Sequence, residues 1–426
     1  MLDINLFRTN PELIRENIKK KFQDSKLPLV DQIIELDKKL RETRSEADSL
    51  RNQRNVNSKR IGALMASGKK AEAEEAKASV IEINAKLEGL KEAEEALAAD
   101  LKKPLMLIPN IIADSVPIGR NDSENVEVEK FGAPVVPGFE IPYHIDIMER
   151  LNGIDLDSAR KTAGNGFYYL KGDVARLHSA VLSYARDFMI ERGFIYYIPP
   201  YMIRGSVVTG VMSFDEMENM MYKIEGEDLY LIGTSEHSMI GKFIDTLSDP
   251  KDLPQALTSY SPCFRKEVGA HGIEERGVYR VHQFEKQEMI VVCQPEDSEK
   301  WFTKLYGNTV DFFRSLDIPV RTLECCSGDL ADLKVKSIDV EAWSPRQKKY
   351  FEAGSCSNLG DAQARRLGIR VRGDKANYFA HTLNNTVAAP PRMLIAFLEN
   401  NLCEDGSVNL PEPLRMYMGG KDKITN

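Results

Sequence analysis

The sequence lacks any long apolar run and any general excess of positive charge. No stretch approaches the ~20 consecutive apolar residues that a membrane-spanning helix needs. The N-terminal segment carries early charges and has no apolar core, so we do not expect a secretory signal peptide. The formal net charge of −8 argues against a general nucleic-acid binder, and any such contact should be local. We therefore expect a soluble cytoplasmic protein with no membrane partner.

Cysteine is scarce and scattered. The six cysteines include no Cys-x-x-Cys pair and do not cluster with any of the six histidines. Zinc sites and disulfide frameworks need such groupings, so we expect neither, and free thiols fit a reducing cytosol better. The glycine patterns GxGxxG and GxxxxGK[ST] are absent as well, which argues against Rossmann and P-loop nucleotide binding.

A heptad pattern is the clearest periodic signal in this chain, whose 426 residues are enough for two or three domains. Apolar residues recur at spacings of three and four over residues 33–64, and again over residues 73–101. A Ser-Gly pair lies between the two runs. The pattern predicts two helices that form an antiparallel coiled-coil arm, about residues 30–101, closed by a turn at that pair.

The middle of this arm is basic. Residues 51–70 carry six basic side chains and no acid: Arg51, Arg54, Lys59, Arg60, Lys69 and Lys70. Two positions of the apolar seam there, Arg54 and Asn57, are polar, which weakens packing where a structural coil would have leucine. Charge alone leaves two interpretations open, a solvated coiled-coil tip or a phosphate-binding fingertip on an otherwise acidic protein.

A segment rich in proline, asparagine and aspartate follows the arm and predicts a domain boundary over residues 102–138. From there helix and strand patterns alternate without the regularity of βαβ units. The expected elements are helices over 174–192, 301–316 and 391–401, and strands over 194–198, 229–233, 337–343, 349–357 and 379–383. Such hairpins with interleaved helices predict an α+β domain built on an antiparallel sheet.

One stretch, residues 263–288, concentrates charged and aromatic side chains. It reads as two strands joined by a glycine-rich turn, with Phe264 at the start of the first strand. Side chains alternate between the faces of a strand, so two sets are expected: Arg265 with Glu267, and Phe284 with Lys286 and Glu288. Such a surface suits a nucleotide with a polar co-substrate. A charged, solvated hairpin is the alternative that this stretch leaves open.

Two further groups are candidates for binding anions and metals. Arg392 falls in the first turn of the last expected helix, where the electropositive helix end favours anions. Glu352 and Ser355 offer hard oxygen ligands to Mg²⁺ on a triphosphate. Alternatives stay open for both groups. Arg392 could simply pair with a surface acid, and Glu352 and Ser355 could be a charge at a strand end and a serine in a turn.

Taken in order, these motifs resemble those of seryl-tRNA synthetases. The matching segments are TSE at 234–236, FRKE at 264–267, RVHQFEKQE at 280–288, ExxSCSN at 352–358, QARR at 363–366, and HTLN followed by Arg392. The heptad hairpin ahead of them resembles that family's tRNA-binding arm, so the resemblance covers essentially the whole chain. Each motif alone is weak, but their joint order together with the arm is specific.

The resemblance implies a class II synthetase catalytic domain that works as a homodimer. The implied domains are an N-terminal tRNA-binding domain (1–103), a linker (104–138) and the catalytic domain (139–426). The three class II motifs would fall on helix 174–192 with Pro200 as a dimer contact, on 263–288, and on 384–400. The implied reaction joins L-serine and ATP to seryl-adenylate. Serine then passes to the 3′ end of tRNA(Ser), and of tRNA(Sec) where that tRNA is present.

The resemblance also implies roles for single residues. Arg265 and Arg392 would be catalytic, on the α- and γ-phosphates. The ATP site would comprise Arg265, Lys266, Glu267, Val281, His282, Gln283, Phe284, Glu352, Ala353, Gly354, Ser355 and Arg392. The serine pocket would comprise Thr234, Ser235, Glu236, Arg265, Glu288, Asn384 and Thr386. Glu352 and Ser355 would contact Mg²⁺ bound with ATP, no zinc is expected, and the six basic residues of the arm would bind tRNA.

The sequence departs from the family pattern at residues 386–391, where Thr-Val-Ala-Ala-Pro-Pro stands in place of the glycine-rich approach that many members have before Arg392. No departure removes a charged catalytic group. Two rival functions remain. A synthetase-like paralogue that charges a carrier protein would not need the arm, and a non-catalytic tRNA-binding relative should have lost charged motif residues.

Overall fold

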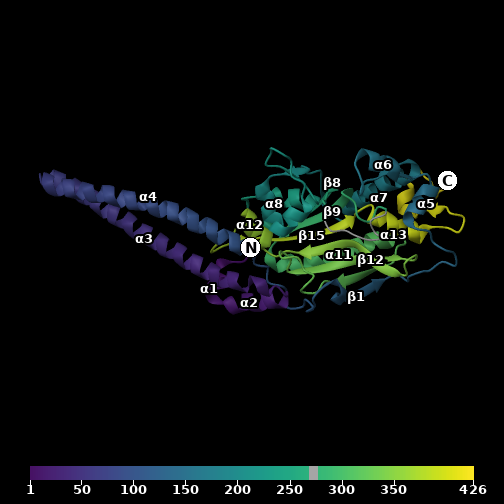
Figure 1. Ribbon diagram of the computed structural model, residues 1–426, viewed down its shortest axis with the longest axis horizontal. Coiled ribbons are helices and arrows are strands. Elements are labelled where there is room, and N and C mark those ends of the chain that lie inside the picture. The colour runs from purple at the N-terminus through teal and green to yellow at the C-terminus, as the bar shows by residue number, and fades with distance from the viewer. Residues whose placement is uncertain (268–276) are drawn as a thin grey trace. The chain divides into compact units, whose positions relative to one another are not determined.

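The computed structural model describes residues 1–267 and 277–426, which divide into two compact units (Figure 1). Leu2–Pro109 form one unit, and Asn110–Asn426 form the other together with Met1. The middle of the glycine-rich turn expected within 263–288 lies outside the described residues. Within the described ranges, no helix is both long enough and apolar enough to cross a membrane.

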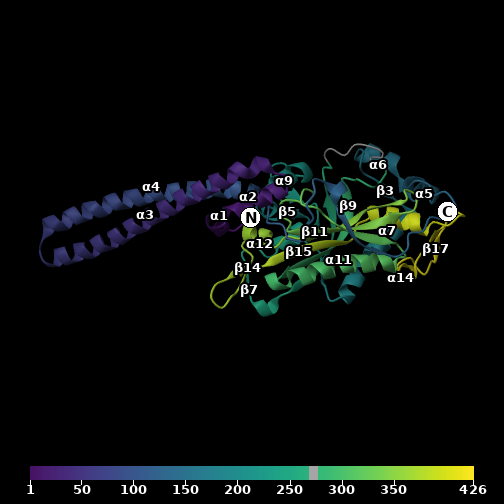
Figure 2. The ribbon, with the colours of Figure 1, turned by 90° about the horizontal axis from the view of Figure 1, so that it is seen from below.

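The first unit is helical. Helices α1 (Ile4–Thr9) and α2 (Pro11–Lys20) precede two long ones, α3 (Leu27–Ala66) and α4 (Lys70–Leu107). The long helices lie side by side and are joined at 67–69, where Gly68 has a φ of +73° (Figure 2). Their buried residues follow the heptad seam: Ile33, Leu40, Ala47, Ala73, Ala76, Ile83 and Leu101. The predicted coiled-coil arm is therefore confirmed.

An eight-stranded sheet forms the centre of the second unit. Its strand order is β1-β10-β11-β12-β15-β9-β8-β4, and neighbours run antiparallel except for the parallel pair β4–β8. The strands are β1 (Val126–Phe131), β4 (Ile195–Tyr197), β8 (Gln255–Phe264), β9 (Gln283–Cys293), β10 (Val320–Glu324), β11 (Lys336–Ser344), β12 (Lys349–Asn358) and β15 (His381–Ala388). The predicted α+β domain on an antiparallel sheet is confirmed.

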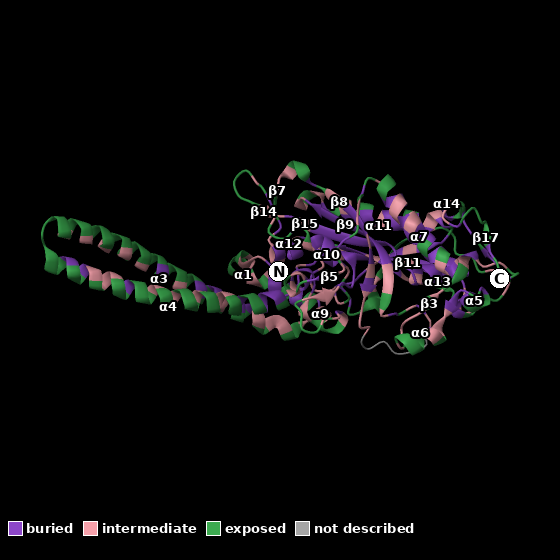
Figure 3. Cartoon of the chain, turned by 90° about the horizontal axis from the view of Figure 1, so that it is seen from above, coloured by how far each residue is buried: buried purple, intermediate pink, exposed green. Residues whose placement is uncertain are grey.

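Three longer helices pack on this sheet: α7 (Gly172–Glu191), α11 (Ser298–Ser315) and α13 (Arg392–Asn401). The main core lies between them and the strands, and its largest fully buried side chains include Phe302, Phe312, Phe313 and Phe397. Figure 3 shows these strands as largely buried, whereas exposed residues run along most of α3 and α4.

Shorter elements complete the second unit. The helices are α5 (His144–Arg150), α6 (Leu156–Thr162), α8 (Gly205–Val211), α9 (Phe214–Met220), α10 (Ser235–Gly241), α12 (Ala362–Leu367) and α14 (Glu412–Arg415). The strands are β2 (Ile154–Asp155), β3 (Tyr169–Leu170), β5 (Met202–Ile203), β6 (Tyr230–Leu231), β7 (Leu247–Ser248), β13 (Arg370–Val371), β14 (Tyr378–Phe379), β16 (Val408–Asn409) and β17 (Lys423–Ile424). They form small sheets of two or three strands.

The segment 104–138, which we expected to be a linker, is partly built into both units. Helix α4 continues to Leu107, and Val126–Phe131 is an edge strand of the large sheet, paired antiparallel with β10. Its sequence, Val-Glu-Val-Glu-Lys-Phe, begins with an alternation of apolar and polar residues, a strand signal that our linker assignment overlooked, although almost all of its side chains are exposed. Its place at the sheet edge is set by backbone hydrogen bonds to β10.

The strand expected to begin at Phe264 ends there instead. The backbone N–H of Lys266 leaves the β8–β9 ladder and donates to the carbonyl of Met220 at 3.0 Å. Glu267 then takes a left-handed conformation with a φ of +48°. The prediction that Arg265 and Glu267 share one strand face was therefore wrong, although both side chains reach the same cavity.

Candidate active site

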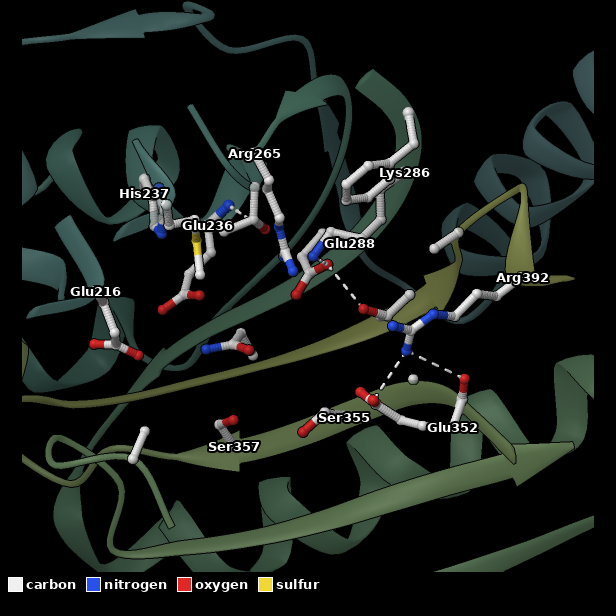
Figure 4. Close-up of a pocket in the computed structure, with 18 of the residues that line it drawn as sticks. Glu216, Glu236, His237, Arg265, Lys286, Glu288, Glu352, Ser355, Ser357 and Arg392 are labelled. Carbon is white, nitrogen blue, oxygen red and sulfur yellow. Dashed lines mark hydrogen bonds and ion pairs between the residues drawn. The ribbon is translucent and has the colours of Figure 1, made fainter. Parts of the chain in front are cut away.

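A cavity of about 350 Å³ lies over the middle strands of the large sheet (Figure 4). Most of the residues proposed from the sequence as ligand contacts line it: Thr234, Glu236, Arg265, Glu267, Val281, Phe284, Glu288, Glu352, Ala353, Gly354, Ser355, Asn384, Thr386 and Arg392. The chain thus brings together residues from five separated segments at one place.

The register of the strands explains how distant segments meet. Glu288 on β9 stands opposite Thr386 on β15, and Asn384 on β15 stands opposite Ser357 on β12. Antiparallel partners that stand opposite each other have Cβ atoms about 5 Å apart. Three neighbouring strands therefore form one continuous polar floor beneath the cavity.

Glu288 is the most tightly held acid of the cavity. Lys286, two residues earlier on the same strand face, places its Nζ 2.6 Å from Glu288 Oε2. The hydroxyl of Thr386 donates to the same oxygen at 3.3 Å. The Lys286 and Glu288 side chains are only 8% and 2% exposed, so water does little to screen this ion pair.

Glu236 is the second residue of α10, and the hydroxyl of the N-cap residue Thr234 accepts the backbone N–H of Glu236 at 3.4 Å. The side-chain amide of Gln363 donates to the Glu236 carboxylate at 2.8 Å. Burial raises the pKa of Glu236 to about 7, and the negative charge of Glu288 acts in the same direction. An acid of this kind changes its charge near neutral pH.

The two arginines lie further along the cavity. Arg392, the first residue of α13, donates from Nη1 to Glu352 Oε2 at 2.9 Å. Partial desolvation inside the cavity favours a higher pKa for Glu352, whose side chain is 45% exposed, but the charge and the hydrogen bond of Arg392 outweigh it and hold that pKa below its ordinary value. The guanidinium of Arg265 lies 5.3 Å from the ring centre of Phe284, and its Nε donates to the carbonyl of Gly233 at 3.2 Å.

Four residues proposed from the sequence make contacts elsewhere. The Lys266 ammonium donates to a carbonyl of α9 at 3.2 Å, and the His282 ring lies 2.9 Å from the hydroxyl of Tyr222. Gln283 lines a different cavity, on the side of the strand that faces α7. Ser235 is fully buried and accepts a hydrogen bond from a serine of β8 at 2.7 Å. Their roles stay predictions that this geometry does not support.

The cavity is also lined by ionisable side chains that we did not propose as site residues: Glu216, His237, Arg280, Lys286 and Lys334. The sequence could have identified Lys286 as a site residue, because strand alternation places it on the same face as Phe284 and Glu288. Burial lowers the pKa of His237 to about 3, so this ring is neutral at ordinary pH. Lys334 comes from the loop before β11, with its Nζ 3.5 Å from the hydroxyl of Ser355, and no periodic pattern marks it.

A second, more polar cavity of about 800 Å³ adjoins the arginine end and shares Lys334, Glu352, Ser355 and Arg392 with the first. Burial raises the pKa of Asp339, one of its acids, to about 6. Among the residues that the structure describes, ligand atoms of Cys325, Asp329 and Asp339 lie within 4.8 Å of one another there. The arginine end of the site is therefore rich in both acidic and basic groups.

Family models match both units of the chain. Residues 1–112 match the seryl-tRNA synthetase N-terminal domain. Residues 220–401 match the tRNA synthetase class II core domain (G, H, P, S and T). Among curated proteins, the serine–tRNA ligase of Methanoculleus marisnigri is 40% identical over 434 residues and covers 100% of both chains. That of Methanospirillum hungatei is 42% identical over 426 residues, 99% of this chain and 100% of the relative.

Solved structures agree with these matches. The seryl-tRNA synthetase from Pyrococcus horikoshii complexed with ATP superposes with a TM-score of 0.93 and 38% identity, over 100% of this chain and 99% of that one. The cytoplasmic serine–tRNA ligase from Naegleria fowleri in complex with AMP gives a TM-score of 0.88 and 34% identity over the same shares. The similarity thus runs the whole length of the chain.

Proposed function

Because this chain belongs to the seryl-tRNA synthetase family, we propose that it activates L-serine with ATP and transfers the serine to the 3′ end of tRNA(Ser). One observation supports the proposal most: Arg265, Arg392, Glu288 and Glu352, from distant parts of the chain, line a single cavity. Such a set can neutralise a triphosphate and grip a small zwitterion at the same time. We extend the proposal to tRNA(Sec) where that tRNA occurs.

In the first step an oxygen of the serine carboxylate attacks the α-phosphorus of ATP. The new P–O bond gives seryl-adenylate, while the bond between the α-phosphorus and its bridging oxygen breaks and diphosphate leaves. The step needs alignment and neutralised charge rather than a proton-transfer base. We assign Arg265 to the α-phosphate and the serine carboxylate, and Arg392 to the γ-phosphate.

The remaining contacts follow from the positions of the groups. We assign Phe284 to stacking on the adenine and Glu267 to its polar edge, because the Phe284 ring lies close to the Arg265 guanidinium. The serine pocket is then the end that holds Glu236 and Glu288, with Thr234, Asn384 and Thr386 beside them. In the second step a terminal ribose hydroxyl of the tRNA attacks the seryl carbonyl, and AMP leaves.

The residues present fit Mg²⁺ carried with ATP. Glu352 and Ser355 line the cavity together and offer hard oxygen ligands, and the Glu352 side chain is 45% exposed and so can be reached. Mg²⁺ is commonly held by one or two carboxylates together with substrate phosphates and water. When bound, it would neutralise charge on the phosphates beside Arg392. We infer no zinc requirement.

We also infer that the protein works as a cytoplasmic homodimer and that the arm binds tRNA. All six cysteines are free, which suits a reducing compartment. Ile195 on the edge strand β4 and Ile198 just after it are largely exposed, and exposed apolar side chains at a sheet edge are typical of an interface. The six basic residues of the arm supply phosphate contacts on an otherwise acidic protein.

ATP–diphosphate exchange with a panel of amino acids, followed by charging of tRNA, tests the proposal. We expect exchange with serine alone and transfer of serine to tRNA(Ser). Exchange without transfer to any tRNA would favour a paralogue that charges a carrier protein. No exchange with any amino acid would favour a non-catalytic tRNA-binding relative.

A further inference from the structure

The two acids at the serine end of the cavity have different electrostatic partners (Figure 4). Glu288 is paired with the Lys286 ammonium at 2.6 Å, and both side chains are buried. Among the residues that the structure describes, Glu236 forms no ion pair, and its carboxylate accepts from the neutral amide of Gln363 at 2.8 Å. One carboxylate thus has a cation in direct contact, whereas Lys286 and Lys334 act on the other only from beyond ion-pair distance.

The geometry around Glu288 leaves one oxygen for a ligand. Lys286 and Thr386 both contact Oε2, at 2.6 and 3.3 Å, and no hydrogen bond from a described residue reaches Oε1. Glu288 is the one acid within ion-pair distance of Lys286 in the described part of the chain. The two therefore act as a neutral unit that still presents a strong hydrogen-bond acceptor.

This difference decides which part of serine each acid attracts. An ammonium group placed beside Glu288 would be attracted by its carboxylate and repelled by Lys286, so it gains little. A neutral hydroxyl needs only an acceptor, which Oε1 provides. Glu236 has no cation at ion-pair distance among the described residues, so it gains more from an ammonium. Burial raises its pKa to about 7, although the more distant charges of Lys286 and Lys334 act to lower it.

We propose that Lys286 determines substrate specificity: by neutralising Glu288 it reserves that carboxylate for the serine hydroxyl and leaves Glu236 for the substrate ammonium. The inference rests on the proposed function and deepens it, since it concerns the same pocket. Lys286 acts through Glu288, so its role is one of positioning and charge rather than of bond formation.

The sharpest test uses 2,3-diaminopropionate, which carries an amino group where serine carries its hydroxyl. It is compared with serine and alanine in ATP–diphosphate exchange at about pH 8, where most of Glu236 is charged and the side-chain amino group of diaminopropionate still carries its proton. We expect the wild-type protein to activate diaminopropionate no better than alanine, because Lys286 removes the attraction for a second ammonium. Activation within about tenfold of serine would overturn the proposal.

Lys286→Met removes the charge while keeping an unbranched side chain. In this variant Glu288 is free to attract the second ammonium, so the preference for serine over diaminopropionate should fall at least about tenfold, the lower end of coupling measured for close charge pairs. Lys286→Arg keeps the charge and should keep the wild-type preference. Lys300→Met, at an exposed position of α11, controls for the new side chain and should change nothing.

Thermal unfolding shows whether Lys286→Met is folded; if it is not, the wild-type comparison still decides. A folded variant with an unchanged preference but a raised KM for ATP would place Lys286 on the phosphates and overturn the proposal. Failure of the proposed function is a separate result, since the wild-type protein would then show no exchange with serine at all.

Discussion

Arg392 and Glu352 meet at 2.9 Å across the arginine end of the cavity, although 40 residues separate them in the sequence. The arginine opens α13 and the glutamate lies on β12. The sequence left two alternatives for Arg392, an anion-binding residue or the partner of an acid. The structure shows the acid partner, and the proposed function keeps the anion-binding role as well. The acid is itself the proposed contact of Mg²⁺ carried with ATP, so we infer that the pair orients both groups for a triphosphate.

Removing either guanidinium should slow adenylate formation sharply. We expect Arg265→Ala and Arg392→Ala each to lower the rate of serine activation about 10²-fold or more, the usual cost of losing one charge-stabilising donor. Lysine should rescue poorly, because it keeps the charge but loses the planar fork of donors. Single-turnover formation of seryl-adenylate measures this directly.

The matched control is Arg372→Ala, which removes an exposed arginine outside the cavity. It should leave the rate of adenylate formation unchanged. If Arg392→Ala formed adenylate at the wild-type rate, the assignment of Arg392 to the γ-phosphate would be wrong.

Local patterns predicted most of the fold. The heptad seam from Ile33 to Leu101 located the arm because an isolated pair of helices must bury one stripe against each other. Alternation along β9 put Phe284 and Glu288 on one face, and both line the cavity. These features depend on residues within a few turns or pleats of one another, which a sequence displays directly.

Features that depend on distant partners were not predicted. The chain leaves β8 after Phe264 because Lys266 finds the carbonyl of Met220, some 46 residues away. Lys334 reaches the cavity from a loop whose path is set by its neighbours rather than by its own sequence. Strand β1 is a different case: its Val-Glu-Val-Glu start alternates as a strand does, but the segment around it, rich in proline, asparagine and aspartate, led us to expect a linker.

Glu236 should make serine binding depend on pH. Its carboxyl must be charged to hold the substrate ammonium, and its pKa is about 7 in the free protein. We therefore expect the KM for serine to rise as pH falls below about 7. Glu236→Gln should bind serine weakly at every pH and lose this dependence, while the KM for ATP stays near the wild-type value. A wild-type profile that is flat through neutral pH would contradict the assignment.

The same carboxyl should weaken the free protein at high pH. Burial raises the pKa of Glu236 from 4.5 to about 7, so the folded state binds the proton more tightly than the unfolded state. Its stabilising contribution is complete below about pH 4.5 and is lost as pH rises to about 7. Glu236→Gln avoids that loss. Its Tm should exceed the wild-type Tm by more at about pH 8 than at about pH 5 in calorimetry without ligands.

Charge at the exposed sheet edge should break the proposed homodimer. Ile195 is 55% exposed and Ile198 is 66% exposed, so a glutamate at either position costs little in a monomer. Buried between two copies, the same charges would carry a desolvation penalty. We expect the double variant Ile195→Glu, Ile198→Glu to sediment as a monomer and the wild-type protein as a dimer. Ile81→Glu, on the exposed side of α4, should remain a dimer.

The six basic residues of the arm should not contribute equally to tRNA binding. Arg51 pairs with Asp48 at 2.6 Å and Lys69 pairs with Glu72 at 3.0 Å, so acids just outside residues 51–70 already neutralise two of them. Lys59 and Arg60 are exposed and form no ion pair with any described residue. We expect Lys59→Glu with Arg60→Glu to weaken tRNA binding more than Arg51→Glu with Lys69→Glu.

Salt dependence separates phosphate contacts from damage to the fold. Each lost phosphate contact should reduce the slope of log K against log salt concentration by about one, so the Lys59→Glu, Arg60→Glu variant should bind tRNA with a slope about two units shallower. Removal of residues 30–100 should abolish tRNA charging while serine-dependent exchange continues, because no residue of the cavity lies in that segment. Normal charging of tRNA by the shortened protein would show that the arm is a solvated coil and not a tRNA-binding element.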